Sequence, residues 1–278
     1  MILFKRVGSA FKGIEGREWA LLTLETLGVV AGIMIAFELN EWASRRNEAA
    51  RHQMMMERLF EESEWDITIL RPFRDGMREQ VKDEEEFASQ LSSGKCPPED
   101  LWRAVGTVAM LPALDAPRSV YNELMGAGGL SSIDDESVRA QITNFNRSMA
   151  WGQKQIDYFR MVKRDPVPAE DARVRVAYDP KADEPQVETY DREALCSDQA
   201  FKNRMAQETR QHRVALSYHE GAYEDAIWMC AALGESLGRR CNPTVGGQLA
   251  PDDMKILNKA ILKYREDHAK KSPPAPSK

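Results

Sequence analysis

A long apolar stretch near the start of this chain reads WALLTLETLGVVAGIMIAF and covers residues 19–37. Its one charged residue is Glu25, and the next charged residue is Glu38. An α-helix needs about 20 mainly apolar residues to cross a hydrocarbon core roughly 30 Å thick. The core helix of a soluble protein is the alternative, but such a helix keeps a polar face, and the run after Glu25 has none. We therefore expect a transmembrane helix over residues 19–39.

A basic tail over residues 1–18 precedes the apolar stretch, as it would in an anchor or in a signal peptide. The apolar region of a signal peptide has only about 7–15 residues and leads to a small-x-small cleavage site. This run is longer, and no such site follows it cleanly. The tail favours a cytoplasmic N-terminus, although Arg45, Arg46 and Arg51 nearly balance its charge on the other side. We expect an uncleaved single-pass anchor, with its C-terminal domain outside the cytoplasm.

One face of the expected span carries Glu25, Gly28, Gly32 and Ala36, which are three, four and four residues apart. Small residues at GxxxG spacing allow two membrane helices to approach closely. An ionisable residue in a bilayer is costly and usually faces protein or water. This face therefore predicts association with a second copy or with another membrane protein. Glu25 either takes part in proton or ion chemistry there or reaches the headgroups.

Trp19 and Trp42 flank the same span. Tryptophan is enriched at both membrane–water interfaces, where its ring lies at the level of the headgroups. We expect both residues to be interfacial anchors, with membrane lipid as the first partner.

The whole chain has 278 residues, a net charge of −6 and 29% charged residues, with a mean hydropathy of −0.52. About 240 residues follow the span, enough for one large or two small domains with a buried core. The acidic balance lacks the basic footprint on which nucleic-acid binding relies. We expect a water-soluble domain over residues 40–265 and no nucleic-acid partner.

Hydrophobic periodicity predicts an all-α protein. No proline or glycine occurs between Glu38 and Pro72, so the transmembrane helix should continue as a stalk to about residue 70. GAGG at residues 126–129 should end a short helix, because the Lys and Ser or Thr of a phosphate-binding loop do not follow it. Asp134 or Asp135 can cap the next long helix. The helices expected after the stalk, packed as an antiparallel bundle, cover residues 73–91, 99–111, 119–125, about 135–163, 199–237 and 251–265.

Apolar residues along the stalk recur at alternating three- and four-residue spacings, which predicts a packed seam. Its members are Leu39, Trp42, Ala49, Met56, Phe60, Ile67 and Leu70.

Two segments have loop composition. Residues 165–191 are polar and rich in proline and should be mainly irregular, although RVRVAY and QVETY within them can pair as a small β-ribbon. Residues 266–278 end in KKSPPAPSK and should be disordered.

The cysteines form an even set of four, Cys96, Cys196, Cys230 and Cys241. An even number near loops and helix ends fits disulfides of an oxidising compartment. Cys230 and Cys241 can pair locally, which leaves Cys96 with Cys196, but the sequence does not fix the connectivity. Four unrelated thiols in a cytoplasmic domain are the alternative.

The expected helix at 199–237 carries the best candidates for chemistry, Glu208, His212, His219, Glu220 and Glu224. A di-metal site in a helical bundle needs a Glu-x-x-His pair on each of two helices, and none occurs here. We interpret these residues as exposed polar groups. We therefore expect no catalytic residues, no bound metal and no cofactor.

The order of these features resembles an uncharacterised bacterial family of single-span membrane proteins, catalogued only as a domain of unknown function. The matching positions near the span are Glu25, Gly32, Asn40, Trp42, Leu59 and Glu62. YNELMGAGGLSSIDDESVRAQITNF at 121–145 and SDQAFKNRM at 197–205 are similar to later parts of the family pattern. The resemblance implies the architecture and a location in the bacterial inner membrane, and it implies no activity.

Three hypotheses about function follow. The first is a non-enzymatic, oligomerising membrane-anchored module for protein contacts or sensing. The second is a subunit of an ion- or proton-coupled membrane assembly that uses Glu25. The third is a membrane-tethered enzyme that uses His212 and His219.

Overall fold

A computed structural model of the chain describes residues 16–126, 128–178, 180–181, 186–243 and 249–271, without the side chains of residues 16–23, 186–187 and 271. These residues are mainly helical, and the strands among them form a single two-stranded sheet. The expectation of an all-α protein with a long N-terminal helix is therefore confirmed. Most of the predicted basic tail and the side chain of Trp19 lie outside the described residues.

Contacts divide the chain into two units, Met1–Met54 and Met55–Lys278. The described part of the first unit is the beginning of helix α2 (Gly16–Ser92). This helix is long and apolar enough to cross a membrane, and none of its apolar window is buried. All residues from 24 to 51 are exposed. In the single chain, Leu39, Trp42 and Ala49 of the predicted seam are exposed, whereas its later members are buried within the second unit.

Helix α2 continues through Pro72 to Ser92, so the predicted break at this proline is wrong. A proline inside a helix removes one backbone hydrogen bond and costs about 3 kcal/mol. Ile67 and Leu70 before the proline and Met77 and Val81 after it are all buried in one core. Packing on both sides therefore outweighs the local cost, as tertiary context often does.

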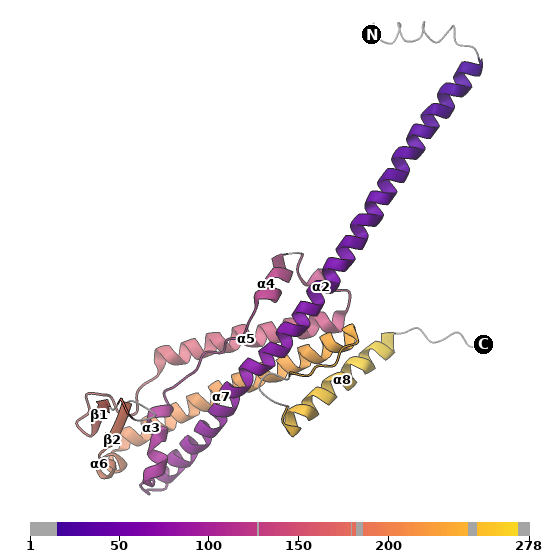
Figure 1. Cartoon of the computed structure of the whole chain (residues 1–278). Coiled ribbons are helices and arrows are strands. Elements are labelled where there is room, and N and C mark those ends of the chain that lie inside the picture. Colours follow the sequence, from indigo (N-terminus) through magenta and orange to yellow (C-terminus); the bar gives the residue numbers. More distant parts are fainter. Residues whose placement is uncertain (1–15, 127, 179, 182–185, 244–248, 272–278) are drawn as a thin grey trace, which may run out of the picture. The chain divides into compact units, whose positions relative to one another are not determined.

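The second unit contains the elements that follow α2 in the chain. In order they are η2 (Glu99–Trp102), α3 (Arg103–Thr107), α4 (Ser119–Gly126), η3 (Gly129–Ser132), α5 (Glu136–Val162), β1 (Val174–Tyr178), β2 (Gln186–Tyr190), α6 (Arg192–Ser197), α7 (Gln199–Leu237) and α8 (Pro251–Lys271). Figure 1 shows the ribbon and α6 at the N-terminal end of α7, with α8 beside its C-terminal half.

Capping residues explain where the two long later helices begin. The side chain of Asp135 accepts hydrogen bonds from the backbone of Ser137 and Val138 at the start of α5. Asp198 does the same for Ala200 at the start of α7. Such caps satisfy backbone N–H groups that have no partner within the helix. Both predicted helices are confirmed, as is the antiparallel ribbon, whose register pairs Val174 with Tyr190.

The predicted boundaries differ from the structure at three places. The helix expected at 99–111 is a short 3-10 turn followed by α3, which ends at Thr107. The short helix α6 was not predicted. Helix α8 extends to Lys271, so residues 266–271 of the predicted disordered tail are helical, and residues 272–278 lie outside the described part.

The helix directions follow from side-chain pairs. Arg78 of α2 pairs with Glu220 of α7 and Arg213 pairs with Glu85, so these two helices are antiparallel. Helices α7 and α8 are parallel, because Tyr223 bonds Asp253, and Glu235, twelve residues later in α7, bonds Arg265 of α8. The expectation of a wholly antiparallel arrangement is therefore wrong for α8. After α7 the chain turns back beside this helix, where Cys241 is bonded to Cys230.

Two hydrophobic cores lie in the second unit. The larger one joins α2, α4, α5, α7 and α8. The smaller one is built around aromatic rings, with Trp102 stacked on Phe201 at 6.0 Å and edge-on to Phe87 at 5.2 Å between centroids. It holds the short elements η2, α3 and α6 against the ends of α2 and α7.

Candidate functional site

The predicted transmembrane face is open in the structure. Glu25, Gly28, Gly32 and Ala36 are all exposed. Apart from backbone of the same helix, no atom lies within 4 Å of the point where a Cβ would stand on Gly28 or Gly32. Trp42 is also exposed, with its ring under the guanidinium of Arg46. No residue in the described part of the chain covers the face, which leaves it accessible to lipid or to a second helix.

The polar residues predicted as exposed on α7 divide into two groups. Glu220 and Glu224 lie at the surface, where Glu220 accepts from Arg78 and Glu224 from Trp228. Glu208, His212 and His219 are buried, so the interpretation of these three as exposed groups is wrong. Their spacings of four and seven residues place the three side chains on one face of α7. This face packs against α2 and the end of α5, so it does not face water.

His212 forms a buried pair with Glu84 of α2. Its Nδ1 atom lies 2.7 Å and 2.9 Å from the two carboxylate oxygens of Glu84, and both side chains are fully buried. Thr107 donates a hydrogen bond of 3.1 Å to the same carboxylate. Burial raises the pKa of Glu84 against the opposing effect of His212. Buried polar groups nearly always have hydrogen-bond partners. The contacts of Glu84 with His212 and Thr107 therefore link α2 to α7 and α3.

His219 and Glu208 lie on the same helix but do not join this pair. Burial lowers the pKa of His219 to about 4, which keeps its ring neutral at pH 7. Glu208 accepts the backbone N–H of Arg164, just past the end of α5, at 3.1 Å. In the described part of the chain, neither histidine belongs to a group of three ligating atoms close enough to hold a metal ion. The arrangement supports a structural role for these residues.

A groove of about 700 Å³ lies between α2, the segment at 109–112 and the end of α5. Its charged lining residues are Arg160 and Lys163. Arg160 donates to the backbone carbonyl of Leu111 at 3.0 Å and 2.8 Å, and Lys163 donates to that of Ala109 at 3.4 Å. Both cations therefore attach the segment at 109–112 to α5.

The structure contains two disulfides, Cys96–Cys196 and Cys230–Cys241, with Cα–Cα distances of 5.4 Å and 5.7 Å. They join the pairs that the sequence analysis considered. The first links the end of α2 to the end of α6, and Cys96 is exposed. The second is buried and fixes the segment after α7 to that helix.

Sequence reasoning missed Glu64 altogether and named Glu62 only as a position that matches the resembled family. Both residues stand on α2 and bind later segments. Glu64 lies beside the Cys230–Cys241 disulfide and accepts the backbone N–H of Asn242 at 2.8 Å. Glu62 accepts from the start of α4, more than 50 residues later in the chain. No local pattern in the sequence reveals such long-range partners.

Comparison of the chain with protein-family models, with curated proteins and with solved structures found no match.

Proposed function

We propose that this chain is a non-enzymatic, membrane-anchored helical protein whose transmembrane helices associate through the face formed by Glu25, Gly28, Gly32 and Ala36. The observation that carries the proposal is that this face is exposed and that both glycines are open to a neighbouring backbone. Close packing of small residues is a main source of association between helices in lipid, where the hydrophobic effect is absent. The second unit then serves as a helical bundle, presented on the membrane for protein contacts or sensing.

The proposed orientation places the N-terminus in the cytoplasm and the helical domain on the outer side of the inner membrane of a bacterium. Two disulfides support it, because disulfides persist mainly in oxidising compartments. A membrane-impermeant thiol reagent tests it on intact cells. Labelling only after reduction supports the orientation, whereas free thiols that react only after lysis contradict it.

The association is tested by replacing Gly28 and Gly32 together with leucine. We expect a smaller oligomer in detergent by light scattering, because the added side chains hold the two backbones apart. Val30 and Met34 have the same spacing and lie about 200° around the helix from the two glycines. Val30→Leu with Met34→Leu is therefore the matched control and should leave the mass unchanged. An unchanged mass in the glycine variant contradicts the interface.

Glu25 lies on the same face and supports the second hypothesis, a subunit of a proton- or ion-coupled assembly, since intramembrane ionisable residues are costly and usually functional. The substitution Glu25→Gln distinguishes the second hypothesis from the proposed non-enzymatic module. Loss of proton or ion coupling with an unchanged oligomer favours the second hypothesis. If the Glu25→Gln variant assembles normally and cell physiology is unchanged, the second hypothesis is wrong.

A further inference from the structure

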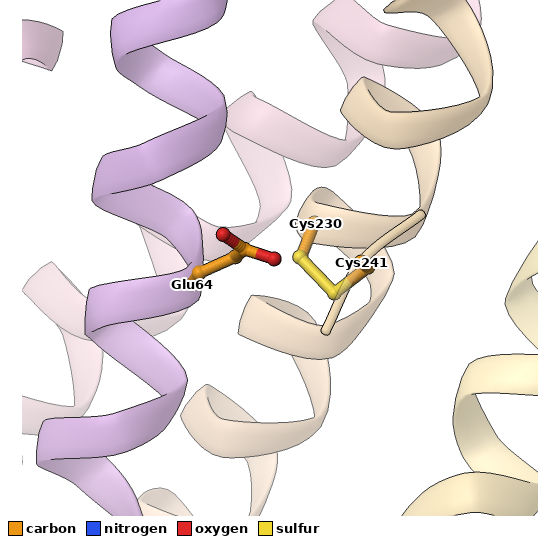
Figure 2. Close-up of side chains that lie close together, drawn as sticks. All are labelled: Glu64, Cys230 and Cys241. Atoms are coloured by element: carbon orange, nitrogen blue, oxygen red, sulfur yellow. A yellow bond between two sulfur atoms is a disulfide. The ribbon is translucent and has the colours of Figure 1, made fainter. Parts of the chain in front are cut away.

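Three atoms that can bind a metal ion meet beside α7. The sulfur atoms of Cys230 and Cys241 and a carboxylate oxygen of Glu64 all lie within 4.8 Å of one another. Figure 2 shows the carboxylate pointing from α2 towards the disulfide. Both cysteines are buried, with 0% and 4% of their surface exposed. The carboxylate is thus held next to the bridge at the edge of the core.

Contacts other than the disulfide also hold Cys241 near Cys230. Helix α7 ends at Leu237, and the next residue, Gly238, has a φ of 65° that turns the chain back. Arg239 donates its backbone N–H to Gly234 at 2.8 Å, and Asn242 donates to Glu64 at 2.8 Å. These bonds lie on either side of Cys241. We therefore expect the two thiols to stay close to each other and to Glu64 when the bridge is reduced.

We propose that Glu64, Cys230 and Cys241 form a redox-gated site for Zn²⁺. A dithiol reductant exchanges with the bridge, so that one disulfide is reduced to two thiols and the dithiol becomes a disulfide. Zn²⁺ then binds the two sulfurs as thiolates, with release of two protons. The oxidised chain cannot provide these ligands. This proposal is independent of the proposed membrane association.

The donor set suits zinc. Zinc binds thiolate sulfur at about 2.3 Å and carboxylate oxygen at about 2.0–2.2 Å, usually in a tetrahedron. Two sulfurs and one oxygen fill three corners, and water fills the fourth. The other bridge is a natural control, because Cys96 and Cys196 have no third ligating group of this kind among the described residues.

The first test uses the full chain in detergent, reduced with a phosphine and freed of reductant without oxygen. Co²⁺ is added as a spectroscopic substitute for Zn²⁺. We expect one equivalent to give the strong visible bands of tetrahedral cobalt and a thiolate-to-cobalt band in the near ultraviolet, and Zn²⁺ to displace it. The oxidised chain should give neither band.

Two variants that remove proposed ligands, each with a matched control, identify the ligands. Cys230→Ser with Cys241→Ser should abolish the thiolate band, and Cys96→Ser with Cys196→Ser should retain it. Glu64→Gln keeps an oxygen that can accept from Asn242 but loses the carboxylate, so the affinity for cobalt should fall by about tenfold or more. Glu61→Gln, on the exposed side of the same helix, should bind as the unchanged chain does.

The proposal is overturned if reduced protein gives no tetrahedral spectrum, if the spectrum survives loss of Cys230 and Cys241, or if Glu64→Gln binds cobalt normally. A second measurement needs no variant. Because a ligand stabilises the form that it binds, Zn²⁺ in a glutathione buffer should shift the Cys230–Cys241 pair towards its thiols and leave Cys96–Cys196 unchanged. Equal shifts of both pairs also contradict the site.

Discussion

Tyr223 donates its hydroxyl hydrogen to Asp253 across 2.9 Å, which joins α7 to α8 at a point where both side chains are almost fully buried. Arg74 of α2 completes the contact. Its guanidinium lies 3.7 Å from the centre of the Tyr223 ring and bonds both oxygens of Asp253, at 2.8 Å and 3.2 Å. Burial opposes the charge on Asp253, but Arg74 and Tyr223 outweigh this effect and lower its pKa.

Replacing Asp253 with alanine should lower the free energy of unfolding by about 3 kcal/mol, because the buried guanidinium of Arg74 then keeps only Asp75, which is half exposed, as its carboxylate partner. Urea unfolding followed by circular dichroism measures the loss. Asp252 is the matched control, since it is exposed and pairs only with Lys255 on the surface. Asp252→Ala should leave the midpoint nearly unchanged, and an equal loss in both variants would contradict the role of Arg74.

His219 should make the fold less stable in acid. Its pKa in the folded chain is about 4, below its ordinary value of 6.5, so between these values the unfolded chain binds a proton that the folded chain does not. The stability is therefore complete above pH 6.5 and falls as the pH drops to 4. The loss is on the order of 3 kcal/mol, since one pKa unit corresponds to about 1.4 kcal/mol.

His219→Gln should reduce the dependence of stability on pH between 6.5 and 4, whatever its effect at pH 7. Urea unfolding at several pH values gives this slope for both proteins. His52 lies in the first unit, and His52→Gln should keep the slope. A slope that is the same with and without His219 would show that other groups cause the acid sensitivity.

Glu62 should be required for the order of α4. Its carboxylate accepts from the Ser119 hydroxyl at 2.9 Å and from the backbone of Val120 and Tyr121 at 2.8 Å and 3.1 Å. Glu62→Ala leaves these donors at the start of the helix without their acceptor, at a cost of about 2 kcal/mol or more. Hydrogen exchange of residues 119–126 should become faster. Glu61→Ala, at an exposed neighbouring position, should change neither quantity.

Gly234 permits the chain to return over α7. A Cβ at this position would lie 2.8 Å from the carbonyl oxygen of Arg239 and 3.2 Å from the ring of Phe60. Gly234→Ala should therefore cost about 1–3 kcal/mol, as overpacking does, and should slow formation of the Cys230–Cys241 bridge. Mass spectrometry after thiol blocking follows that step during refolding.

Gly221 provides the comparison on the same helix, because no atom other than those of its chain neighbours and the backbone of the same helix lies within 4 Å of its expected Cβ. Gly221→Ala should raise stability by up to about 1 kcal/mol, since glycine is unfavourable in a helix interior. A loss of stability in this variant as large as that of Gly234→Ala would show that the close contacts are not the cause.

Local signals in the sequence predicted most helices and the ribbon. Asp134 or Asp135 was expected to cap α5, and Asp135 does so, because a cap acts within three residues of itself. The sequence failed at Pro72, where the local rule predicted a break and distant packing kept the helix intact. The sequence also showed no sign that Glu84 is buried, because this residue stands in a run of acidic residues, which are usually exposed to solvent. Its partner His212 is 128 residues away, and no pattern along the chain connects them.

The Cys96–Cys196 bridge connects residues that are 100 positions apart, and the other bridge lies wholly outside that interval. A single proteolytic cut between residues 96 and 196 therefore releases no fragment. The two pieces stay covalently joined, with the mass of the intact chain plus one water, until a reductant is added. In limited proteolysis, a single cut in this interval should therefore become visible only on a reducing gel, and a full-length band without reduction is no proof that the backbone is whole.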